Sequence, residues 1–370
     1  MADMRKAFLA DIIENIDDDA PRLVFADWLE DDGDPARAEF IRLQCKEAAA
    51  ESWPSPWVAW ERGASVTPRE SALIAGHGAE WMKEAPKWAT ERTPKRGIFH
   101  RGFVARVSST GRNWQKGVAA LYRRVPIEGL QLRAMNDSLL TALSARPEFG
   151  NLRLLELWTR GCSPASLAQF FASADLHRVV TLECTLPSRG IEHLNSLLAS
   201  DRIGGVRSLV LSGGLFGVER FTSLAASGLA PRLRSLAVDA TRISGAAAMA
   251  FSRSRNFSEL EELSMRARNL EDEGVIILAG SPYLGKLRRL HLGSSAFLEE
   301  RVIQALTTSP YLTHLTDLAL DYRGARPETI GLIAESESLI HLRRLRVNKD
   351  GKCQRILKRL AERRRERGIE

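Results

Sequence analysis

The sequence has little cysteine and no long apolar run, and each shortage excludes a class of protein. Its four cysteines, Cys45, Cys162, Cys184 and Cys353, are scattered without a C-x-x-C pair, so neither a disulfide framework nor a zinc site is expected. No stretch approaches the roughly 18 uninterrupted apolar residues of a membrane helix. Residues 1–13 alternate charged and apolar side chains instead of forming the apolar core of a secretory signal. We therefore expect a soluble, cytoplasmic protein with reduced thiols.

Motifs that carry chemistry are also missing. The sequence contains no glycine-rich phosphate loop, no H-E-x-x-H and no G-x-S-x-G. The seven histidines, among them His77, His100, His177 and His193, lack the spacing of metal ligands. The sequence therefore predicts neither an enzyme nor a protein that binds a cofactor or a metal.

Two acidic runs, Asp17–Asp19 and Glu30–Asp34, raise the question of a calcium loop. If Gly33 took the sixth position of an EF-hand, Trp28 would take the first, where a ligand carboxylate is required. The calcium interpretation therefore fails. Turn formation and helix capping are the roles that we expect for these carboxylates.

Negative charge is concentrated at the front of the chain. Residues 1–45 hold 12 Asp or Glu and 5 Lys or Arg, a net charge of −7, whereas the rest of the chain sums to +14. Opposite charge could make the two parts attract each other, or let each part recruit a different partner.

An apolar triplet, with members at a first position and at +3 and +5, recurs along the chain. The triplets are Ile127-Leu130-Leu132, Leu152-Leu155-Leu157, Val179-Leu182-Cys184, Val206-Leu209-Leu211, Leu233-Leu236-Val238, Leu260-Leu263-Met265, Leu287-Leu290-Leu292, Leu315-Leu318-Leu320 and Leu342-Leu345-Val347. Their first positions lie 25, 27, 27, 27, 27, 27, 28 and 27 residues apart. So regular a spacing over nine triplets is not expected by chance, so the sequence predicts an array of repeats.

Further apolar residues keep the same phase and are predicted to share the buried core. At +10 stand Cys162, Phe216, Ile243, Leu270 and Phe297; at +18 stand Phe170, Leu197, Leu224, Phe251, Leu278, Ala305 and Ile333; at +24 stand Leu176, Ile203, Phe257, Leu284, Tyr311 and Leu339. One +10 position holds Arg189, and Ile191 is expected to replace it.

Each repeat is predicted to supply one strand and one helix. The triplet has the alternation of a strand, and segments such as Ala246–Ser252 and Asp272–Ala279 are predicted helices that pack against it. Because one repeat cannot bury this surface alone, neighbouring repeats stack and share a core. Strands about 4.8 Å apart, set against thicker helices, should curve the stack with the parallel sheet on the concave side.

These repeats resemble the leucine-rich-repeat family. The even spacing of the triplets, with a helix in each repeat, resembles its ribonuclease-inhibitor-like subclass. The segment Leu260–Gly274 is the best match, with Asn269 where the family places a turn asparagine, which most other repeats lack. The resemblance covers about residues 98–350 and implies an α/β fold, a solenoid with a curved parallel sheet inside and helices outside.

Residues 1–50 are predicted to form an acidic helical module. Apolar residues recur at helical spacing at Phe8, Leu9, Ile12, Ile13 and Ile16. Asp17–Asp19 with Pro21 should cap a second helix at Arg22–Glu30, and Asp34 with Pro35 should start a third at Ala36–Lys46. The segment Pro21–Gln44, above all Ala26–Glu30 and Ala38–Gln44, resembles the repeat-companion domain, a module found before repeats in planctomycete-like and myxobacterium-like bacteria. That resemblance implies no known activity.

The two ends of the array are expected to be capped. Residues 51–97 carry Trp53, Trp57, Trp60, Trp81 and Trp88, which we expect to connect the module and seal the first repeat, with a binding patch as the alternative. The segment Arg101–Val107 alternates like a strand and should open the sheet. Residues 351–370 form the other cap, a basic helix at Gln354–Arg367 with its apolar stripe at Ile356, Leu357 and Leu360.

Side chains at +2, +4 and +6 of each repeat are predicted to face the concave side. The candidate protein-binding residues there are Arg133, Glu156, Trp158, Glu183, Asp239, Glu262, Arg266, Arg289, His291, Asp321, Arg344 and Arg346. Trp158 stands out because an exposed Trp is costly unless it packs or binds; it could instead fold back over the N-terminal cap. The mixed charges suit a protein surface. The sequence therefore predicts a non-catalytic scaffold or adaptor that binds a protein partner on this face, with the acidic module recruiting or regulating.

Nucleic-acid association is the alternative function. The sequence pI is about 9.4, and the C-terminal helix holds the densest basic cluster, at Lys358–Arg365. Binding through phosphates would weaken steeply with salt. No recognition motif accompanies this helix, and basic helices often serve only as solvated caps.

Overall fold

The computed structural model describes residues 2–50, 67–89, 98–187, 191–324, 327–347 and 353–369. The chain divides into two compact units. The first unit is Met1–Cys184 with Ser200–Gly205, and the second is Thr185–Ala199 with Val206–Glu370. Among the described helices, none has the length and apolar character needed to cross a membrane.

The repeats supply ten parallel strands that follow chain order in the sheet. They are β3 (Arg106–Thr110), β4 (Gly129–Arg133), β5 (Leu154–Trp158), β6 (Thr181–Thr185), β7 (Ser208–Ser212), β8 (Ser235–Ile243), β9 (Glu262–Leu270), β10 (Arg289–Phe297), β11 (Asp317–Arg323) and β12 (Arg344–Val347). Residues at the same repeat position lie in register, as where Leu236 of β8 pairs with Leu263 of β9 and Leu263 with Leu290 of β10. This is the predicted leucine-rich-repeat fold.

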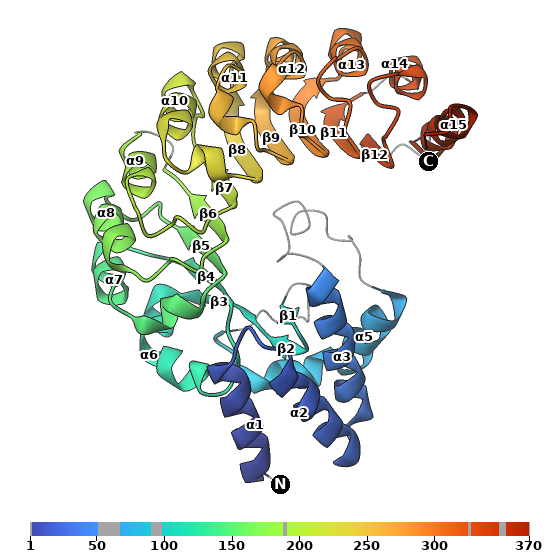
Figure 1. Ribbon diagram of the computed structural model, residues 1–370. Helices are drawn as coiled ribbons and strands as arrows, with labels where there is room; N and C mark the ends of the chain where they lie inside the picture. The colour runs from blue at the N-terminus through green and yellow to red at the C-terminus, as the bar shows by residue number, and fades with distance from the viewer. Residues whose placement is uncertain are drawn as a thin grey trace. The chain divides into compact units, whose positions relative to one another are not determined.

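One helix follows most strands and packs on the same side of the sheet. These helices are α6 (Gly111–Tyr122), α7 (Asp137–Leu143), α8 (Pro164–Ser173), α9 (Glu192–Leu198), α10 (Val218–Ala226), α11 (Gly245–Ser252), α12 (Asp272–Ala279), α13 (Glu300–Thr307) and α14 (Pro327–Gly331). Short 3₁₀ helices lead into the following strands at η2 (Pro147–Asn151), η3 (Ala230–Arg232), η4 (Arg255–Phe257), η5 (Pro282–Leu284) and η6 (Leu332–Glu335). Figure 1 shows α10 to α13 side by side along β7 to β11.

Hydroxyl and amide side chains begin several of these helices. The Ser244 hydroxyl accepts a hydrogen bond from the Ala247 N–H at 3.3 Å at the start of α11, and the Asn136 side chain accepts from the Leu139 N–H at 3.0 Å at the start of α7. Each such cap contributes about 1 kcal/mol to helix stability. The loop from strand to helix is therefore specified locally in these repeats.

The core consists of the triplets and the apolar helix faces. Every residue of the nine triplets is at most 9% exposed. Burial of one Leu or Ile side chain contributes about 1.5–3 kcal/mol, so the repeats are held together mainly by this shared apolar surface. The +10 to +24 positions of the repeats that begin at Val206, Leu233 and Leu260 are buried as predicted. Arg189 lies outside the described residues, and Ile191, which was expected to replace it, is partly buried.

The predicted core was wrong by one residue in the repeat that begins at Leu287. Phe297 is 65% exposed, and Ala305 and Tyr311 are only partly buried. This repeat is longer than its neighbours by a single residue, and its register with β11 shifts between Gly293 and Phe297. The extra residue precedes the +10 position, so all later core positions move by one. The buried residues are Leu298, Leu306 and Leu312.

The N-terminal module contains the three expected helices. They are α1 (Ala2–Glu14), α2 (Ala20–Asp31) and α3 (Pro35–Ala50), and α5 (Pro68–Trp81) with η1 (Met82–Glu84) follows. The core of the module is formed by Ile12, Phe25, Ala26, Leu29, Ala38, Ile41, Cys45 and, from the next segment, Phe103. The residues that carry the resemblance to the repeat-companion domain are therefore largely packing residues.

The acidic runs meet the starts of both helices, α2 and α3, although not through the same position: at α2 the Asp18 carboxylate accepts from the Ala20 N–H at 2.9 Å. Asp34 caps α3, since its carboxylate accepts from the Arg37 N–H at 3.1 Å. Asp19 occupies the capping position of α2 but makes no side-chain capping bond; its carboxylate instead lies 3.2 Å from Nε of Arg101. A helical backbone at Asp19 turns its side chain away from the first-turn N–H groups.

The segment predicted as one strand, Arg101–Val107, was also corrected. β1 (Phe99–His100) and β2 (Phe103–Val104) form an antiparallel hairpin, and β3 then opens the parallel sheet. Gly102 in the turn has φ +85°, and a Cβ there would lie 2.4 Å from Ile41. Its N–H donates to the Gln44 side chain at 2.7 Å. Glycine at this turn therefore lets the hairpin contact α3.

Two of the five clustered tryptophans lie in the described ranges, while Trp53, Trp57 and Trp60 lie outside them. Trp81 stacks on Phe40 with ring centroids 4.7 Å apart, and the ring of Trp88 occupies the space beside Gly117 of α6. Trp88 therefore packs against the first helix of the array, whereas Trp81 packs within the N-terminal module, and sealing of the first repeat by the whole segment stays a prediction. The predicted domain division at residues 50, 97 and 350 stays a prediction.

Candidate functional site

The candidate residues lie on the sheet face opposite the buried leucines, which we call the open sheet face. It is formed by positions +2, +4 and +6 of the repeats, because side chains alternate along a strand. The first unit carries Arg133, Glu156, Trp158 and Glu183, and the second carries Asp239, Glu262, Arg266, Arg289, His291, Asp321, Arg344 and Arg346.

In the second unit, oppositely charged side chains on adjacent strands pair with each other at +2. Arg289 of β10 lies 2.9 Å from the carboxylate of Glu262 on β9. Arg344 of β12 lies 3.4 Å from Asp317 on β11. Adjacent strands are about 4.8 Å apart, so each pair bridges two repeats.

The +4 and +6 positions of the second unit pair in the same way. Arg266 lies 3.3 Å from Asp239. His291 and Asp321 are hydrogen bonded at 2.7 Å, and Arg346 lies 3.4 Å from the same carboxylate. The hydrogen bond from His291, together with the nearby charges, holds the pKa of Asp321 below its usual value despite partial burial. The predicted residues of this unit are therefore paired with one another, except Arg344, whose partner is Asp317.

The first unit has a different arrangement at the same positions. Arg106 of β3 lies 3.0 Å from Glu156 on β5, and Glu183 occupies the equivalent position on β6. Burial, together with the charge of Glu156, raises the pKa of Glu183 to about 7 against the opposing effect of Arg106. Oε1 of Glu183 is buried and has no hydrogen-bond partner among the described residues. Two carboxylates thus share one arginine.

Trp158 lies at the end of β5 beside this carboxylate pair. Its side chain is 44% exposed, and its indole N–H donates to Glu156 at 2.8 Å. More than half of the ring is covered and the rest faces solvent, so Trp158 is accessible to a partner. Arg133 ends the neighbouring strand β4 and makes no ion pair among the described residues. The face thus offers an aromatic ring on β5, an excess carboxylate on β6 and a cation on β4.

Sequence reasoning missed Arg106. Arg106 of β3 pairs in register with Gly129 of β4. The sequence separation of these two residues is shorter than the spacing between the triplets, so the repeat period does not identify Arg106. No triplet marks β3, so the signal available was only the strand alternation of the segment around Val107. The opening strand of the array completes a charge cluster whose other members the repeat phase did identify.

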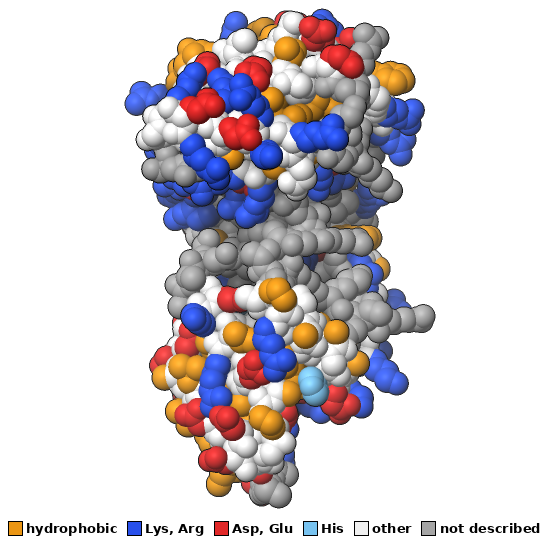
Figure 2. Space-filling view, turned by 90° about the vertical axis from the view of Figure 1, so that its right-hand side faces the viewer, with side chains coloured by type: hydrophobic (Ala, Val, Ile, Leu, Met, Phe, Trp, Pro, Cys, Tyr) orange, Lys and Arg blue, Asp and Glu red, His pale blue; other side chains and the backbone are white. Residues whose placement is uncertain are grey.

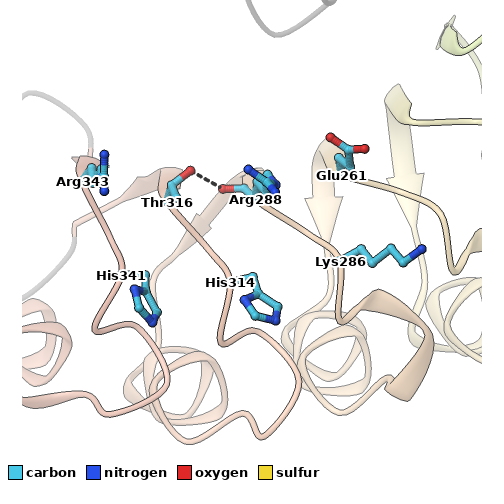
Figure 3. Close-up of a pocket in the computed structure, with 7 residues that line it drawn as sticks. All are labelled: Glu261, Lys286, Arg288, His314, Thr316, His341 and Arg343. Atoms are coloured by element: carbon cyan, nitrogen blue, oxygen red, sulfur yellow. Dashed lines mark hydrogen bonds between the residues drawn. The ribbon is translucent and has the colours of Figure 1, made fainter. Parts of the chain in front are cut away.

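Sequence reasoning also missed a hollow at the starts of the strands in the second unit. It has a volume of about 480 Å³ and is lined by Glu261, Lys286, Arg288, His314, Thr316, His341 and Arg343. Figure 3 shows these side chains along the segments that lead into β9 to β12. They stand at −1 and +1 relative to the first triplet position.

The basic C-terminal helix, α15 (Cys353–Glu366), uses its arginines to bind the last repeats. Arg363 is 7% exposed; it donates to the carbonyls of Ala334 and Ser336 at 3.0 and 3.1 Å and pairs with Glu337. Arg364 donates to two further carbonyls, of Ile340 and Leu342. Figure 2, seen from the side of α15, shows acidic groups among the basic ones on this unit. Much of the basic cluster therefore has a structural role.

The thiols offer no reactive centre. All four cysteines are free and buried, and burial raises the pKa of Cys45 and of Cys162 to about 12. A thiol with such a pKa is a poor nucleophile near neutral pH. Among the described residues, no three His, Cys, Asp or Glu side chains are grouped so as to hold a metal ion.

Comparison with known proteins gives little beyond the fold. No protein-family profile and no curated protein matches the chain. Among solved structures, it is similar to the leucine-rich-repeat ectodomain of the plant membrane receptor kinase GASSHO1/SCHENGEN3 from Arabidopsis thaliana, in complex with CASPARIAN STRIP INTEGRITY FACTOR 2. The identity is 14% and the TM-score 0.23, over 60% of this chain and 33% of that one. The chain thus spans about a third of that ectodomain, and strand register and repeat period identify the fold instead.

Proposed function

We propose that this chain is a protein-binding scaffold whose open sheet face in the first unit holds a basic side chain of a partner protein. The observation that carries the proposal is the exposed Trp158 beside two carboxylates, Glu156 and Glu183, that share a single arginine. The other candidate residues of the face, in the second unit, already have partners within the chain.

The chemistry of this cluster favours a cation. A lysine or arginine of a partner would replace the missing positive charge at Glu183 and favour its ionised form. The indole face of Trp158 would add a cation–π contact of about 0.5–2 kcal/mol. Trp and Arg are also enriched among the residues that dominate protein–protein binding energy. A folded partner with one basic anchor fits this site.

We also propose that the repeats belong to the ribonuclease-inhibitor-like subclass and that residues 1–50 are a repeat-companion module. The even period of the repeats, with one helix in most of them, supports the first part. The packing roles of Ala26, Leu29, Ala38 and Ile41 support the second. Four free, buried cysteines suit a reducing, cytoplasmic setting in a bacterium.

In this proposal the acidic N-terminal module recruits a second partner or regulates binding at the open sheet face, and its acidic turn is held in one conformation. Arg22 is fully buried and donates to the carbonyls of Ile16 and Asp18, which holds the acidic turn in one conformation. Asp31 and Asp32, at the other turn, are exposed and free to meet a second partner. The module is therefore a rigid acidic attachment to the array.

The experiment that tests the binding face is affinity capture with cross-linking from the native cell. The full chain, a Trp158→Ala variant and a Phe297→Ala control would be compared, since Phe297 is an exposed aromatic outside the open sheet face. A partner recovered by the wild type and the control, and reduced at least about tenfold by Trp158→Ala, supports the proposal. Equal recovery by all three contradicts it.

Nucleic-acid binding is the less favoured function, because Arg363 and Arg364 of the basic cluster donate to backbone carbonyls of the last repeats. Its test is the salt dependence of binding to a DNA or RNA oligonucleotide. Phosphate contacts predict a steep loss of affinity as salt rises. Binding that persists unchanged in high salt, or no binding, dismisses this alternative.

A further inference from the structure

The starts of the strands form a second surface, which we call the strand-start edge. It comprises the residues at −1 and +1 relative to the first triplet position. The backbone at +1 continues the ladder between repeats: the Arg288 N–H donates to the Glu261 carbonyl, the Thr316 N–H to the Arg288 carbonyl and the Arg343 N–H to the Thr316 carbonyl, at 2.7–2.8 Å. Side chains at +1 are therefore held in a row with the spacing of the strands.

The first unit shows what this edge binds. The carboxylate of Asp17, from the acidic turn of the N-terminal module, pairs with Arg153 and with Arg178. Arg153 stands at +1 of one repeat and Arg178 at −1 of the next. Hydrogen bonds and the charges of both arginines leave the pKa of Asp17 below its ordinary value, although partial burial acts to raise it. The edge is thus a carboxylate-binding surface within this chain.

The second unit repeats the same two positions, and among its described residues no acidic loop pairs with them. Arg288 stands at +1 and His314 at −1 of the next repeat, and both line the hollow with Arg343 and His341. Among the described residues, the side chains of these four make no ion pair or hydrogen bond. The lining holds three cationic residues, Lys286, Arg288 and Arg343, and one carboxylate, that of Glu261, which lies 3.8 Å from Arg234. Lys286 also pairs with Glu259.

We propose that the strand-start edge of the second unit binds an acidic segment of a partner protein, through carboxylates held as Asp17 is held. Arg288 and Arg343 lie two strands apart, which is about 10 Å at the strand spacing. An extended peptide advances about 3.4 Å per residue. Acidic residues three positions apart therefore match the two arginines, with His314 and Thr316 between them (Figure 3).

A peptide fits this edge better than a phosphate polymer. A nucleic acid gains affinity by neutralising many phosphates along a continuous basic track, whereas Glu261 and Glu259 interrupt the row at one end of the hollow. A short acidic segment needs only the two arginines and their neighbours. Glu261 would also repel a carboxylate placed beyond Arg288, and so fixes where the segment ends.

The test uses the full chain and a fluorescent peptide that copies residues 13–20, the acidic turn that the first unit already binds. Three proteins would be compared: wild type, Arg288→Glu with Arg343→Glu, and a control with Arg253→Glu and Arg255→Glu. The control changes two exposed arginines of the same unit away from the hollow, with the same change of net charge. Circular dichroism would check that all three are folded.

We expect the wild type and the control to bind the peptide, and the Arg288/Arg343 variant to bind at least about tenfold more weakly. A peptide with Asn in place of each Asp should not bind. Equal binding by all three proteins, no binding by the wild type, or binding of a single-stranded RNA in place of the peptide overturns the inference. A Trp158→Ala protein should still bind the peptide, which separates this edge from the proposed function of the open sheet face.

Discussion

The open sheet faces of the two units are built from the same repeat positions but differ in electrostatic balance. In the second unit each predicted charge has a neighbour of opposite sign, as Arg289 has Glu262 and Asp321 has His291 and Arg346. In the first unit Glu156 and Glu183 share Arg106. A charged residue at a given repeat position is therefore structural where an adjacent repeat supplies an opposite charge. Where no opposite charge is supplied, the residue is available for binding.

The difference has an energetic side. The ion pairs of the second unit each join a buried partner to a more exposed one. The attraction between the partners is largely offset by their lost hydration, so the pairs stabilise the register without dominating the stability. A carboxylate held buried beside another carboxylate does the opposite, since folding must work against its ionisation. The unpaired carboxylate of Glu183 therefore lowers the free energy of unfolding of the first unit. Groups with perturbed pKa values of this kind are common at binding and catalytic sites.

The largest effect is expected from a charge in the shared core, and it should be alike in both units. Leu155→Asp and Leu263→Asp each bury an unpaired carboxylate at a fully buried position and should lower the free energy of unfolding by more than about 4 kcal/mol. Hydrogen exchange should show lost protection in the adjacent strands. Arg268→Asp, at an exposed position of β9, is the matched control. A core variant that melts like this control contradicts the repeat phase.

Glu183→Gln should stabilise the protein, by up to roughly 3 kcal/mol above pH 7. Because the pKa of Glu183 is raised to about 7 in the folded state, the folded protein holds a proton that the unfolded chain loses near pH 4.5. Stability therefore falls as pH rises from about 4.5 to 7 and stays lower above it. The variant lacks this loss, so its advantage should disappear below pH 4.5 in denaturant titrations.

The same substitution in the second unit gives the contrast. Glu262 is paired with Arg289 at 2.9 Å, so Glu262→Gln should destabilise the protein slightly or leave it unchanged at pH 7. If both glutamine variants were stabilising to the same extent, the electrostatic difference between the units would be disproved.

Asp321→Asn should destabilise the second unit by about 1 kcal/mol, since it weakens the bonds with His291 and Arg346 at a carboxylate that solvent partly screens. The pKa of Asp321 is lowered in the folded state, so its contribution is present above the unfolded-state pKa and is lost as pH falls through the folded-state pKa. Wild type and variant should therefore converge in acid. Thermal melts at pH 7 and in acid would measure this, and a difference that persists unchanged in acid counts against the pairing.

Trp158→Ala should have the smallest effect on stability, within about 0.5 kcal/mol, because the ring is substantially exposed. This sharpens the comparison, as a residue that matters for binding but not for folding is expected only on the first unit's face. Chemical denaturation with the Phe297→Ala protein as reference would measure it. A loss of several kcal/mol would show that Trp158 is a packing residue.

Much of the fold was predictable because stacking forces one apolar pattern onto every repeat. The triplets and the helix at Asp272–Ala279 could be located from the sequence. The sequence alone does not show that the core positions shift by one at Phe297. The longer spacing between two triplets shows that the repeat has one extra residue, but it does not show at which position the residue is inserted. Capping by Asp19 failed because its backbone is helical, and its carboxylate lies instead beside Arg101, which is distant in the sequence.

The sequence predicted which residues share one face of the sheet. It did not predict which charged residues on that face pair with each other. Alternation along each strand places the twelve candidate positions on one face of the sheet, and their role in binding stays a prediction. Whether Glu183 meets a cation depends on which residue lies on the neighbouring strand, and Arg106 comes from a strand outside the period. The strand-start hollow was missed for a similar reason, as its residues belong to four successive repeats and form no continuous motif.

The most direct test of the unmatched charge is the titration of Glu183 itself. NMR of the full chain with ¹³C-labelled glutamate carboxyls, assigned with the Glu183→Gln protein, would follow this group with pH. The account predicts a pKa of about 7 in the free protein and a fall toward the ordinary glutamate range when a partner with a basic anchor is added. An ordinary pKa in the free protein would contradict it.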